Sequence, residues 1–408
     1  MTDSTETPTP PRFDPLIGRT HLLPAPTNLD AEPLRYRFVG GNNDGESVPH
    51  AALAEAAAVA VNRLGPALAT YNLGGSALGY EPLREFVAEA LTTRASTPTD
   101  AGDVLITSGS LQALDLVNEA LVQPGETVLV EQATYGGMLS RLNRAGIRWR
   151  GVALDGQGIV VDDLERVLTE LAAEGIRPRY LYTIPTVQNP TGSVLPLERR
   201  LAILDVARRN RLAIFEDDCY ADLQWDGDRP PTFRALDDGG GQVIYCGSFS
   251  KSVAPALRVG YIVADRPMLA QLVALKTDAG TGALEQLTLA EFAPAHFNAH
   301  VENLKARLRH KAGVMVDAVR TEFGSSVEIE PPLGGIYVWL TFDDGVDTDA
   351  LAAPAAAAGV EFNPGSGWSA DADDGRRRLR LCFGDQSDED IRTGVATLAR
   401  IAREMTAG

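Results

Sequence analysis

The sequence predicts an α/β protein with a large three-layer αβα domain around a mostly parallel sheet and a smaller α+β domain. At 408 residues the chain exceeds what one compact core usually holds, so two domains are expected. From about residue 51, apolar runs alternate with amphipathic stretches for more than half the chain, which is the pattern of β-α units. Beyond about residue 292 a long helical stretch replaces this alternation, which indicates the second domain.

The expected elements follow one another in a regular order. Residues 1 to about 33 are rich in Thr, Pro and Asp and predict an arm outside the core, whereas the Ala-rich stretch 51–61 predicts a helix. The expected strands are 104–107, 127–130, 180–184, 212–215, 243–246, 259–263, 336–340 and 379–383. The expected domains are residues 1–50 (the arm and part of the small domain), 51–291 (the large domain) and 292–408 (the small domain).

Charge, hydropathy and cysteine content exclude several classes of protein. The chain has 37 basic and 55 acidic residues, and its formal charge of −18 repels nucleic acid and anionic lipid, so neither is an expected partner. No apolar run approaches the roughly 20 residues of a membrane span, and no export signal is evident, which predicts a cytoplasmic protein. Cys219, Cys246 and Cys382 lack metal-ligand spacing and are expected to be reduced core residues, with no metal site.

A lysine, Lys251, follows the expected strand 243–246 within the segment GSFSKS at 247–252. Burial at the end of a strand disfavours the charged amine and lowers its pKa. A neutral amine near pH 7 is a nucleophile that can form a Schiff base with an aldehyde. Since most lysines are solvated surface residues, this interpretation depends on the other segments around it.

The apolar strand 212–215 runs into three acids and then an aromatic hydroxyl, Tyr220. Acids at the end of a buried strand need a cationic partner, and a protonated pyridine nitrogen is one. Asp217 would keep that nitrogen protonated, and Tyr220 could donate to the phenolic oxygen of the same ring. Taken alone, the segment could equally be a solvated or metal-binding acidic turn.

Two glycine-containing turns could complete such a site. The segment QNPTG at 188–192 follows an apolar strand and presents the amide of Asn189. The segment SGS at 108–110 stands at a strand-to-helix junction, where backbone N–H groups and the helix dipole can hold a phosphate. Either turn alone is a common loop. The combination of these two turns with the lysine segment at 247–252 and the acidic strand end at 212–220 is much rarer, and it is highly specific for one kind of site.

Together these segments resemble the class I/II aminotransferases, the fold type I group of pyridoxal-phosphate enzymes, from about residue 38 to the end of the chain. Within that family the chain is most similar to the branch of 2-aminoadipate and kynurenine aminotransferases and to the aminotransferase-like half of certain fused transcriptional regulators. The resemblance implies pyridoxal 5′-phosphate as cofactor and an amino acid and a 2-oxo acid as substrates. It also implies ping-pong transfer through Lys251, which would first hold the cofactor and then shuttle a proton.

The resemblance assigns further roles. Arg380 looks like the arginine that grips the substrate carboxylate, for which a planar guanidinium is well suited. The catalytic residues that the resemblance implies are Lys251, Asp217 and Tyr220, and the substrate-binding residues are Arg380, Asn189 and Gly41.

Two tyrosines match aromatic positions of the family. Tyr135 is similar to the residue that stacks on the cofactor ring, and Tyr71 to the tyrosine that reaches the phosphate in the other subunit, which implies a homodimer with shared active sites. The residues implied to bind the cofactor are Ser110, Leu111, Gln112, Tyr135, Asn189, Asp217, Tyr220, Ser248, Ser250, Lys251, Arg258 and Tyr71. The glycine-rich stretch 72–78 departs from the family and leaves the amino donor open.

Other functions remain open at this point. A lyase, decarboxylase or cyclising enzyme shares Lys251 and Asp217, because the cofactor is the electron sink in each case. The S-x-x-K spacing at 248–251 also fits penicillin-recognising hydrolases, but the K-T-G motif of those enzymes is absent. The acidic run at 216–218 fits the magnesium-binding strand of a nucleotide hydrolase, but the G-x-x-x-x-G-K-[ST] motif of that class is absent. A ligand sensor that resembles the fused regulators would carry a DNA-binding region, whereas the first 50 residues are Pro-rich with few basic groups.

Overall fold

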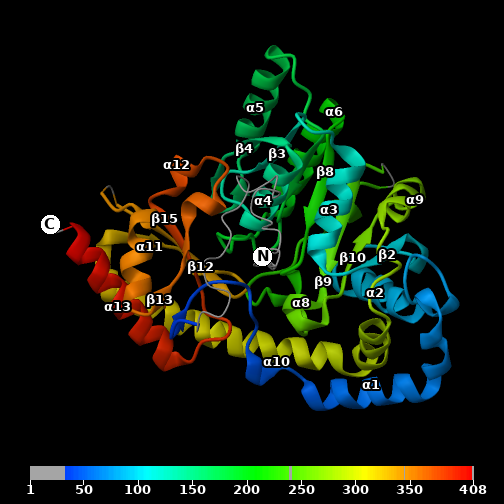
Figure 1. Ribbon diagram of the computed structural model, residues 1–408. Coiled ribbons are helices and arrows are strands. Elements are labelled where there is room, and N and C mark those ends of the chain that lie inside the picture. Colours follow the sequence, from blue (N-terminus) through cyan, green and yellow to red (C-terminus); the bar gives the residue numbers. More distant parts are fainter. Residues whose placement is uncertain (1–32, 239–240, 344, 407–408) are drawn as a thin grey trace, which may run out of the picture. The chain divides into compact units, whose positions relative to one another are not determined.

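A seven-stranded sheet forms the centre of the large domain in the computed structural model, which describes residues 33–238, 241–343 and 345–406 (Figure 1). The strands run parallel except for β10, which pairs antiparallel with both of its neighbours. In sheet order they are β2 (Val104–Thr107), β10 (Gly260–Val263), β9 (Val243–Ser248), β8 (Ala213–Asp217), β7 (Tyr180–Thr183), β3 (Thr127–Glu131) and β4 (Arg148–Val152). The expected mostly parallel sheet is confirmed.

Helices cover both faces of this sheet because successive strand side chains point to opposite faces. On β3, Val128 and Val130 pack with residues of α3 and α4, whereas Leu129 packs with residues of α5 and α6. The three-layer αβα arrangement is therefore confirmed. The helices of this part are α1 (His50–Leu64), α2 (Glu81–Arg94), α3 (Ser110–Leu121), α4 (Gly136–Ala145), α5 (Val161–Ala173), α6 (Leu197–Asn210), α7 (Phe233–Leu236), α8 (Phe249–Ser252) and α9 (Arg266–Leu275).

The expected strands all form, with ends displaced by no more than two residues. The sequence analysis missed β4, an edge strand of sequence RWRGV whose side chains alternate between exposed and part-buried before the buried Val152. It also missed the short hairpin of β5 (Leu154–Asp155) and β6 (Gly158–Ile159). These strands lack the continuous apolar run by which the central strands were recognised.

The small domain is built on an antiparallel four-stranded sheet in the order β11-β12-β15-β14. A two-residue strand near the start of the described chain, β1 (Tyr36–Arg37), pairs with β13 (Val360–Glu361) and so joins this part of the fold. The remaining elements are α10 (Ala283–Phe323), β11 (Val327–Ile329), β12 (Tyr337–Phe342), α11 (Thr348–Ala357), β14 (Asn363–Pro364), α12 (Ala372–Gly375), β15 (Arg378–Cys382) and α13 (Asp388–Thr406).

One long helix, α10, links the two parts of the protein (Figure 1). Residues 289–301 of this helix pack into the core of α2, β2 and β10, and residues 304–323 pack into the core of β12, β15 and α13. The expected domain boundary between residues 291 and 292 therefore falls inside a continuous helix. The expected arm at residues 1–33 lies outside the described residues, except for its last residue.

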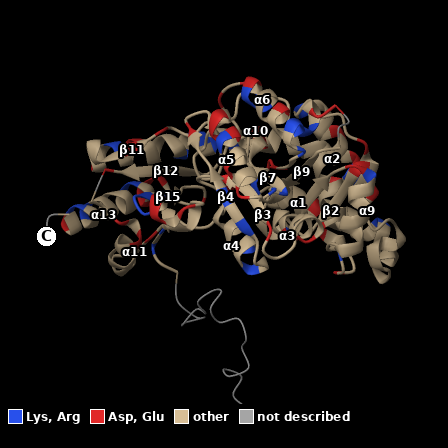
Figure 2. Ribbon diagram, turned by 90° about the horizontal axis from the view of Figure 1, so that it is seen from above, with Lys and Arg blue, Asp and Glu red and all other residues tan. Residues whose placement is uncertain are grey.

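Acidic and basic residues are interspersed along the helices of the described chain (Figure 2). On α5, for example, Arg166 pairs with Asp163 one turn before it and with Glu170 one turn after it. Within residues 33–238, 241–343 and 345–406, no helix combines the length and the apolar character needed to cross a membrane.

The central strand β7 should be sensitive to truncation of its core side chains. Leu181 is 0% exposed, so Leu181→Ala should leave a cavity that costs about 2–5 kcal/mol and should lower the midpoint of thermal unfolding. Leu201 on α6 is 49% exposed, and Leu201→Ala serves as the matched control with little expected change. Equal shifts in calorimetry for the two variants would contradict the placement of β7 in the core.

Candidate active site

A cavity of about 350 Å³ opens where strands of the large sheet end beside the small domain. This volume lies within the range of roughly 300–1,000 Å³ that small-molecule sites occupy. Eleven of the residues predicted from the sequence line this cavity. They are Gly41, Ser110, Leu111, Tyr135, Asn189, Asp217, Tyr220, Ser250, Lys251, Arg258 and Arg380.

Lys251 lies on the short helix α8, directly after β9. Its Nζ donates a hydrogen bond of 2.6 Å to the carbonyl oxygen of Gly41, and its own carbonyl accepts one of 2.7 Å from the Asn43 amide. Burial lowers the pKa of Lys251 from 10.5 to about 8, and the nearby Arg380 guanidinium acts in the same direction. The cavity thus contains an amine that is readily neutral and nucleophilic near physiological pH.

Asp217 ends β8 and is 5% exposed. It accepts hydrogen bonds from the Tyr182 hydroxyl at 2.7 Å and, more weakly, from the Cys219 backbone at 3.4 Å. Burial raises the pKa of Asp217, and no lysine or arginine of the described chain forms a salt bridge that would offset this effect. A buried carboxylate that lines a cavity without a cation fits a ligand that brings its own, such as a protonated ring nitrogen.

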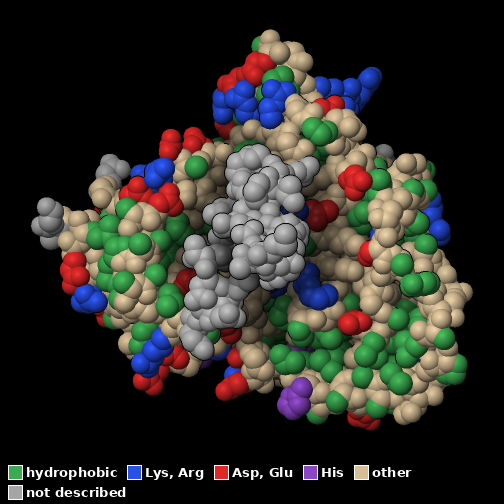
Figure 3. Space-filling model, viewed as in Figure 1, with side chains coloured by type: hydrophobic (Ala, Val, Ile, Leu, Met, Phe, Trp, Pro, Cys, Tyr) green, Lys and Arg blue, Asp and Glu red, His purple; other side chains and the backbone are tan. Residues whose placement is uncertain are grey.

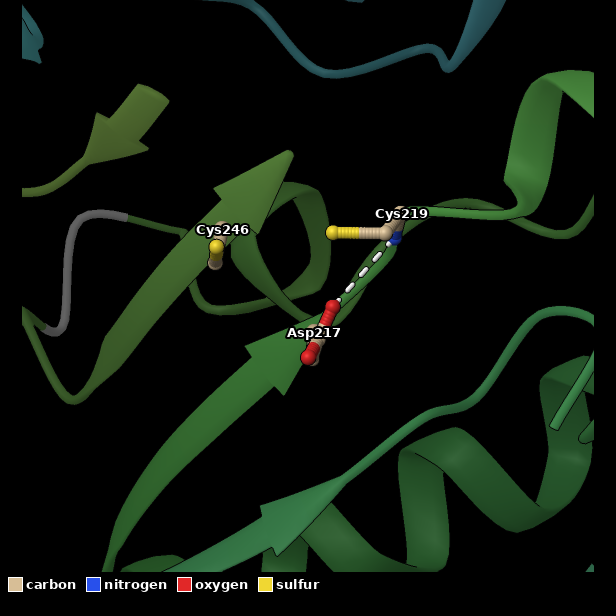
Figure 4. A group of neighbouring side chains, drawn as sticks. All are labelled: Asp217, Cys219 and Cys246. Carbon is tan, nitrogen blue, oxygen red and sulfur yellow. Dashed lines mark hydrogen bonds between the residues drawn. The ribbon is translucent and has the colours of Figure 1, made fainter. Parts of the chain in front are cut away.

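Two thiols flank this carboxylate (Figure 4). Cys219 lies just beyond β8 and Cys246 lies on the neighbouring strand β9, and the two sulfur atoms and a carboxylate oxygen of Asp217 are all within 4.8 Å of one another. The adjacent Cys246 thiol and burial raise the pKa of Cys219 far above its ordinary value, so this thiol is neutral. The cysteines are free, as predicted, and they surround Asp217 with weakly polar atoms.

The opposite end of the site fits a phosphate. Ser110 begins α3, directly after Gly109, which has a positive φ of 81°. A side chain at position 109 would clash with the guanidinium of Arg258. Arg258 in turn approaches the Ser250 hydroxyl at 3.4 Å. Backbone N–H groups at the start of a helix, two serine hydroxyls and a guanidinium are a suitable set of donors for a phosphate dianion.

Arg380 lies on β15 and is 1% exposed. It donates a hydrogen bond of 3.1 Å to the amide oxygen of Asn189 and another to the carbonyl of Gly40. Its guanidinium carbon lies 3.9 Å from the ring centre of Trp368 and 5.2 Å from that of Tyr337. A cation fixed in this way can bind a carboxylate with a defined geometry.

Three predicted cofactor-binding residues lie outside the cavity lining. The hydroxyl of Ser248 accepts a hydrogen bond from the backbone of Ser250 and caps α8. The side chain of Gln112 accepts from the Ser108 backbone at 2.8 Å. Both therefore stabilise the turns that carry the lining residues, whereas Tyr71 is 82% exposed and lies outside the lining of this chain's own cavity.

Sequence reasoning missed several lining residues, of which Trp368 and Asn363 are the largest polar or aromatic ones. Both come from the segment NPGSGW at 363–368 in the small domain. Its turn residues predict a loop, but nothing in the segment indicates that the loop folds back onto the large domain. The further lining residues that were missed are Gly137, Ile184, Cys219 and Pro255, whereas Gly40 was expected near the substrate together with Gly41.

Comparisons with known proteins agree with this geometry. The family model "Aminotransferase class I and II" matches residues 38–398. The 2-aminoadipate transaminase of Thermus thermophilus is 35% identical over 93% of this chain and 93% of its own length. An uncharacterized HTH-type transcriptional regulator of Bacillus subtilis is 32% identical over 80% of this chain and 66% of its own.

A solved structure extends the comparison to the fold. The crystal structure of an alpha-aminoadipate aminotransferase from Thermus thermophilus, complexed with N-(5′-phosphopyridoxyl)-L-leucine, has a TM-score of 0.83 and 35% identity, covering 91% of this chain and 93% of that one. The resemblance inferred from the sequence motifs, including its branch, is confirmed.

The lowered pKa of Lys251 predicts how this residue reacts with an aldehyde. Because only the neutral amine attacks, the rate at which the protein free of cofactor couples to pyridoxal phosphate should rise with pH, reach half of its maximum near pH 8 and level off about one pH unit higher. The measurement is borohydride fixation at each pH, followed by quantification of the peptide that contains Lys251. Lys305 on α10, which is 21% exposed and pairs with Glu302, reports the pH dependence of the reagent at a lysine outside the cavity. A rate at Lys251 that climbs without a plateau to about pH 10 would contradict this prediction.

Proposed function

The chain belongs to the aminotransferase class I and II family, and from this premise we propose that it transfers the amino group of an L-amino acid to a 2-oxo acid by a ping-pong mechanism through Lys251. The cofactor is pyridoxal 5′-phosphate. The observation that carries the proposal is a single cavity that combines the desolvated amine of Lys251, the cation-free carboxylate of Asp217 and the fixed guanidinium of Arg380.

The lining residues fit the cofactor in three places. Asp217 would hold a proton on the ring nitrogen, Tyr135 would flank the ring, and the Ser110, Ser250 and Arg258 cluster would hold the phosphate. When bound, the cofactor supplies an electron-withdrawing ring that stabilises negative charge at the substrate Cα.

The chain's own residues would perform the remaining steps. Arg380 binds the substrate carboxylate, and its hydrogen bond to Asn189 sets the orientation of the guanidinium. Lys251 provides the amine that the substrate displaces, and it then takes the proton from the substrate Cα. A pKa of about 8 suits this exchange, because the amine can both accept and return a proton near neutral pH.

The active form would be a homodimer. Tyr71 lies in η4 (Tyr71–Gly74) and is 82% exposed. Leu68, three residues before it, is 44% exposed, and Leu284, at the start of α10, is 45% exposed. Hydrophobic side chains gather over the part of the surface where α1 and α10 lie (Figures 1 and 3). An exposed apolar surface of this kind is typical of an interface, and a second copy would bring Tyr71 to the phosphate of the partner's cofactor.

A half-reaction tests the function directly. The purified protein with pyridoxal phosphate and one L-amino acid, but no acceptor, should produce one equivalent of the 2-oxo acid and leave the cofactor as pyridoxamine phosphate. A lyase or decarboxylase would instead make product continuously with the cofactor in its aldehyde form. The two products are measured by chromatography across a panel of amino acids. Lys251→Ala should fold but show no turnover, and transamination by this variant would refute the role of Lys251.

The charge at position 217 should govern turnover. Asp217→Asn keeps the shape of the side chain but no longer favours a proton on the ring nitrogen, so the rate of transamination should fall by roughly two orders of magnitude or more. Asp217→Glu retains the carboxylate and should keep more activity than the amide variant. Steady-state kinetics at saturating cofactor provide the measurement, and unchanged kinetics in Asp217→Asn would refute the assignment.

A further inference from the structure

Trp368 is held between the two domains by backbone hydrogen bonds. It ends η9 (Gly365–Trp368), and its carbonyl accepts a hydrogen bond of 2.9 Å from the backbone of Thr134. Two residues further, the backbone of Ala370 donates one of 2.8 Å to the carbonyl of Gln132. Residues 368–370 thus run as a short antiparallel segment beside residues 132–134, which fixes the position of the indole in the cavity.

The indole packs against the guanidinium that would bind the substrate. The guanidinium carbon of Arg380 lies 3.9 Å from the ring centre of Trp368, well within the distance for a cation–π contact. Asn189 and Gly40 accept hydrogen bonds from the same guanidinium. Since an arginine binds a carboxylate in the plane of its fork, a ring stacked on its face fixes that plane and leaves the edge for the carboxylate.

The indole also extends an apolar wall along the cavity. Its ring centre is 5.7 Å from that of Tyr135, and the two rings are inclined by 59°. The apolar lining residues Leu111, Ile184 and Pro255 belong to the same cavity. The side chain of a substrate is attached to the carbon next to the carboxylate, so a carboxylate on Arg380 brings that side chain within reach of Trp368.

We propose that Trp368 is a specificity-determining residue, which orients Arg380 for the carboxylate of every substrate and contacts the side chain of aromatic or large aliphatic amino acids. This inference rests on the proposed function. It assigns Trp368 two effects that can be measured separately: a general effect on carboxylate binding, and a selective effect on apolar amino donors.

Steady-state transamination by the protein loaded with pyridoxal phosphate separates these effects, with L-phenylalanine, L-leucine and L-glutamate as amino donors and a saturating 2-oxo acid acceptor that differs from all three products. Trp368→Ala should raise KM for all three more than it lowers kcat, because the plane of Arg380 is no longer fixed. It should also lower kcat/KM for phenylalanine and leucine roughly tenfold more than for glutamate, because the apolar wall is lost. Trp368→Phe keeps an aromatic ring and should retain most of the selectivity.

Trp225→Phe provides the matched control, because it also replaces an indole but lies outside the cavity lining, and it should leave all three kcat/KM values unchanged. Cofactor content and the thermal midpoint verify that each variant is folded. An equal loss of kcat/KM for phenylalanine and glutamate in Trp368→Ala, or an unchanged KM, would overturn the inference while the proposed function stands. So would a wild-type protein that reacts with glutamate but with neither apolar substrate. A wild-type protein that reacts with no amino acid in the wider panel would overturn the proposed function, and this inference with it.

Discussion

A buried carboxylate that has no cationic partner among the described residues is the constraint on which the site depends. Asp217 is almost completely buried, and its hydrogen bonds come from the Tyr182 hydroxyl and from the backbone and thiol of Cys219. These uncharged donors are too weak to compensate the carboxylate fully for the loss of water. Such a group is costly in a protein alone and becomes favourable when a protonated ligand arrives. Asp217 ends the central strand β8, which pairs with β9. Lys251 follows β9 by three residues, so the carboxylate and the amine lie at the same edge of the sheet.

The segment from Gly40 to Asp44 connects the parts of the fold that meet at the site. The carbonyls of Gly40 and Gly41 accept hydrogen bonds from Arg380 and Lys251, which come from the small and the large domain. At the other end of the segment, Asp44 accepts from the buried Lys311 of α10 at 2.9 Å. Burial alone would raise the pKa of Asp44, but its bonds to Arg307, Ser47 and Lys311 outweigh burial and lower it to about 2. The segment is therefore anchored to the helix that links the domains.

A second buried network positions the turn that carries Asn189. Glu131, at the end of β3, accepts hydrogen bonds from Thr183 at 2.6 Å and from the amide of Gln188 at 2.8 Å. Gln188 in turn accepts from the backbone and hydroxyl of Thr191, which closes the turn. Burial raises the pKa of Glu131 to about 7, and the hydrogen bonds from Gln188 and Thr183 oppose this rise by stabilising the carboxylate. The carboxylate in turn holds the Gln188 side chain that closes the turn. The orientation of Arg380 through Asn189 thus rests on residues that lie outside the cavity lining.

The sequence by itself determined most of the helices and strands and most of the residues that line the cavity, because periodicity and strand-end chemistry are local properties. Lys251, Asp217 and the turn at Ser110 each follow an apolar strand, and parallel strands bring such ends to one edge. Only the tertiary structure decided which distant segments complete the site. Trp368 contacts Thr134 and Arg380, and α10 continues across the expected domain boundary. Both features are set by packing between residues far apart in the chain, for which the local pattern of a single sequence has no signal.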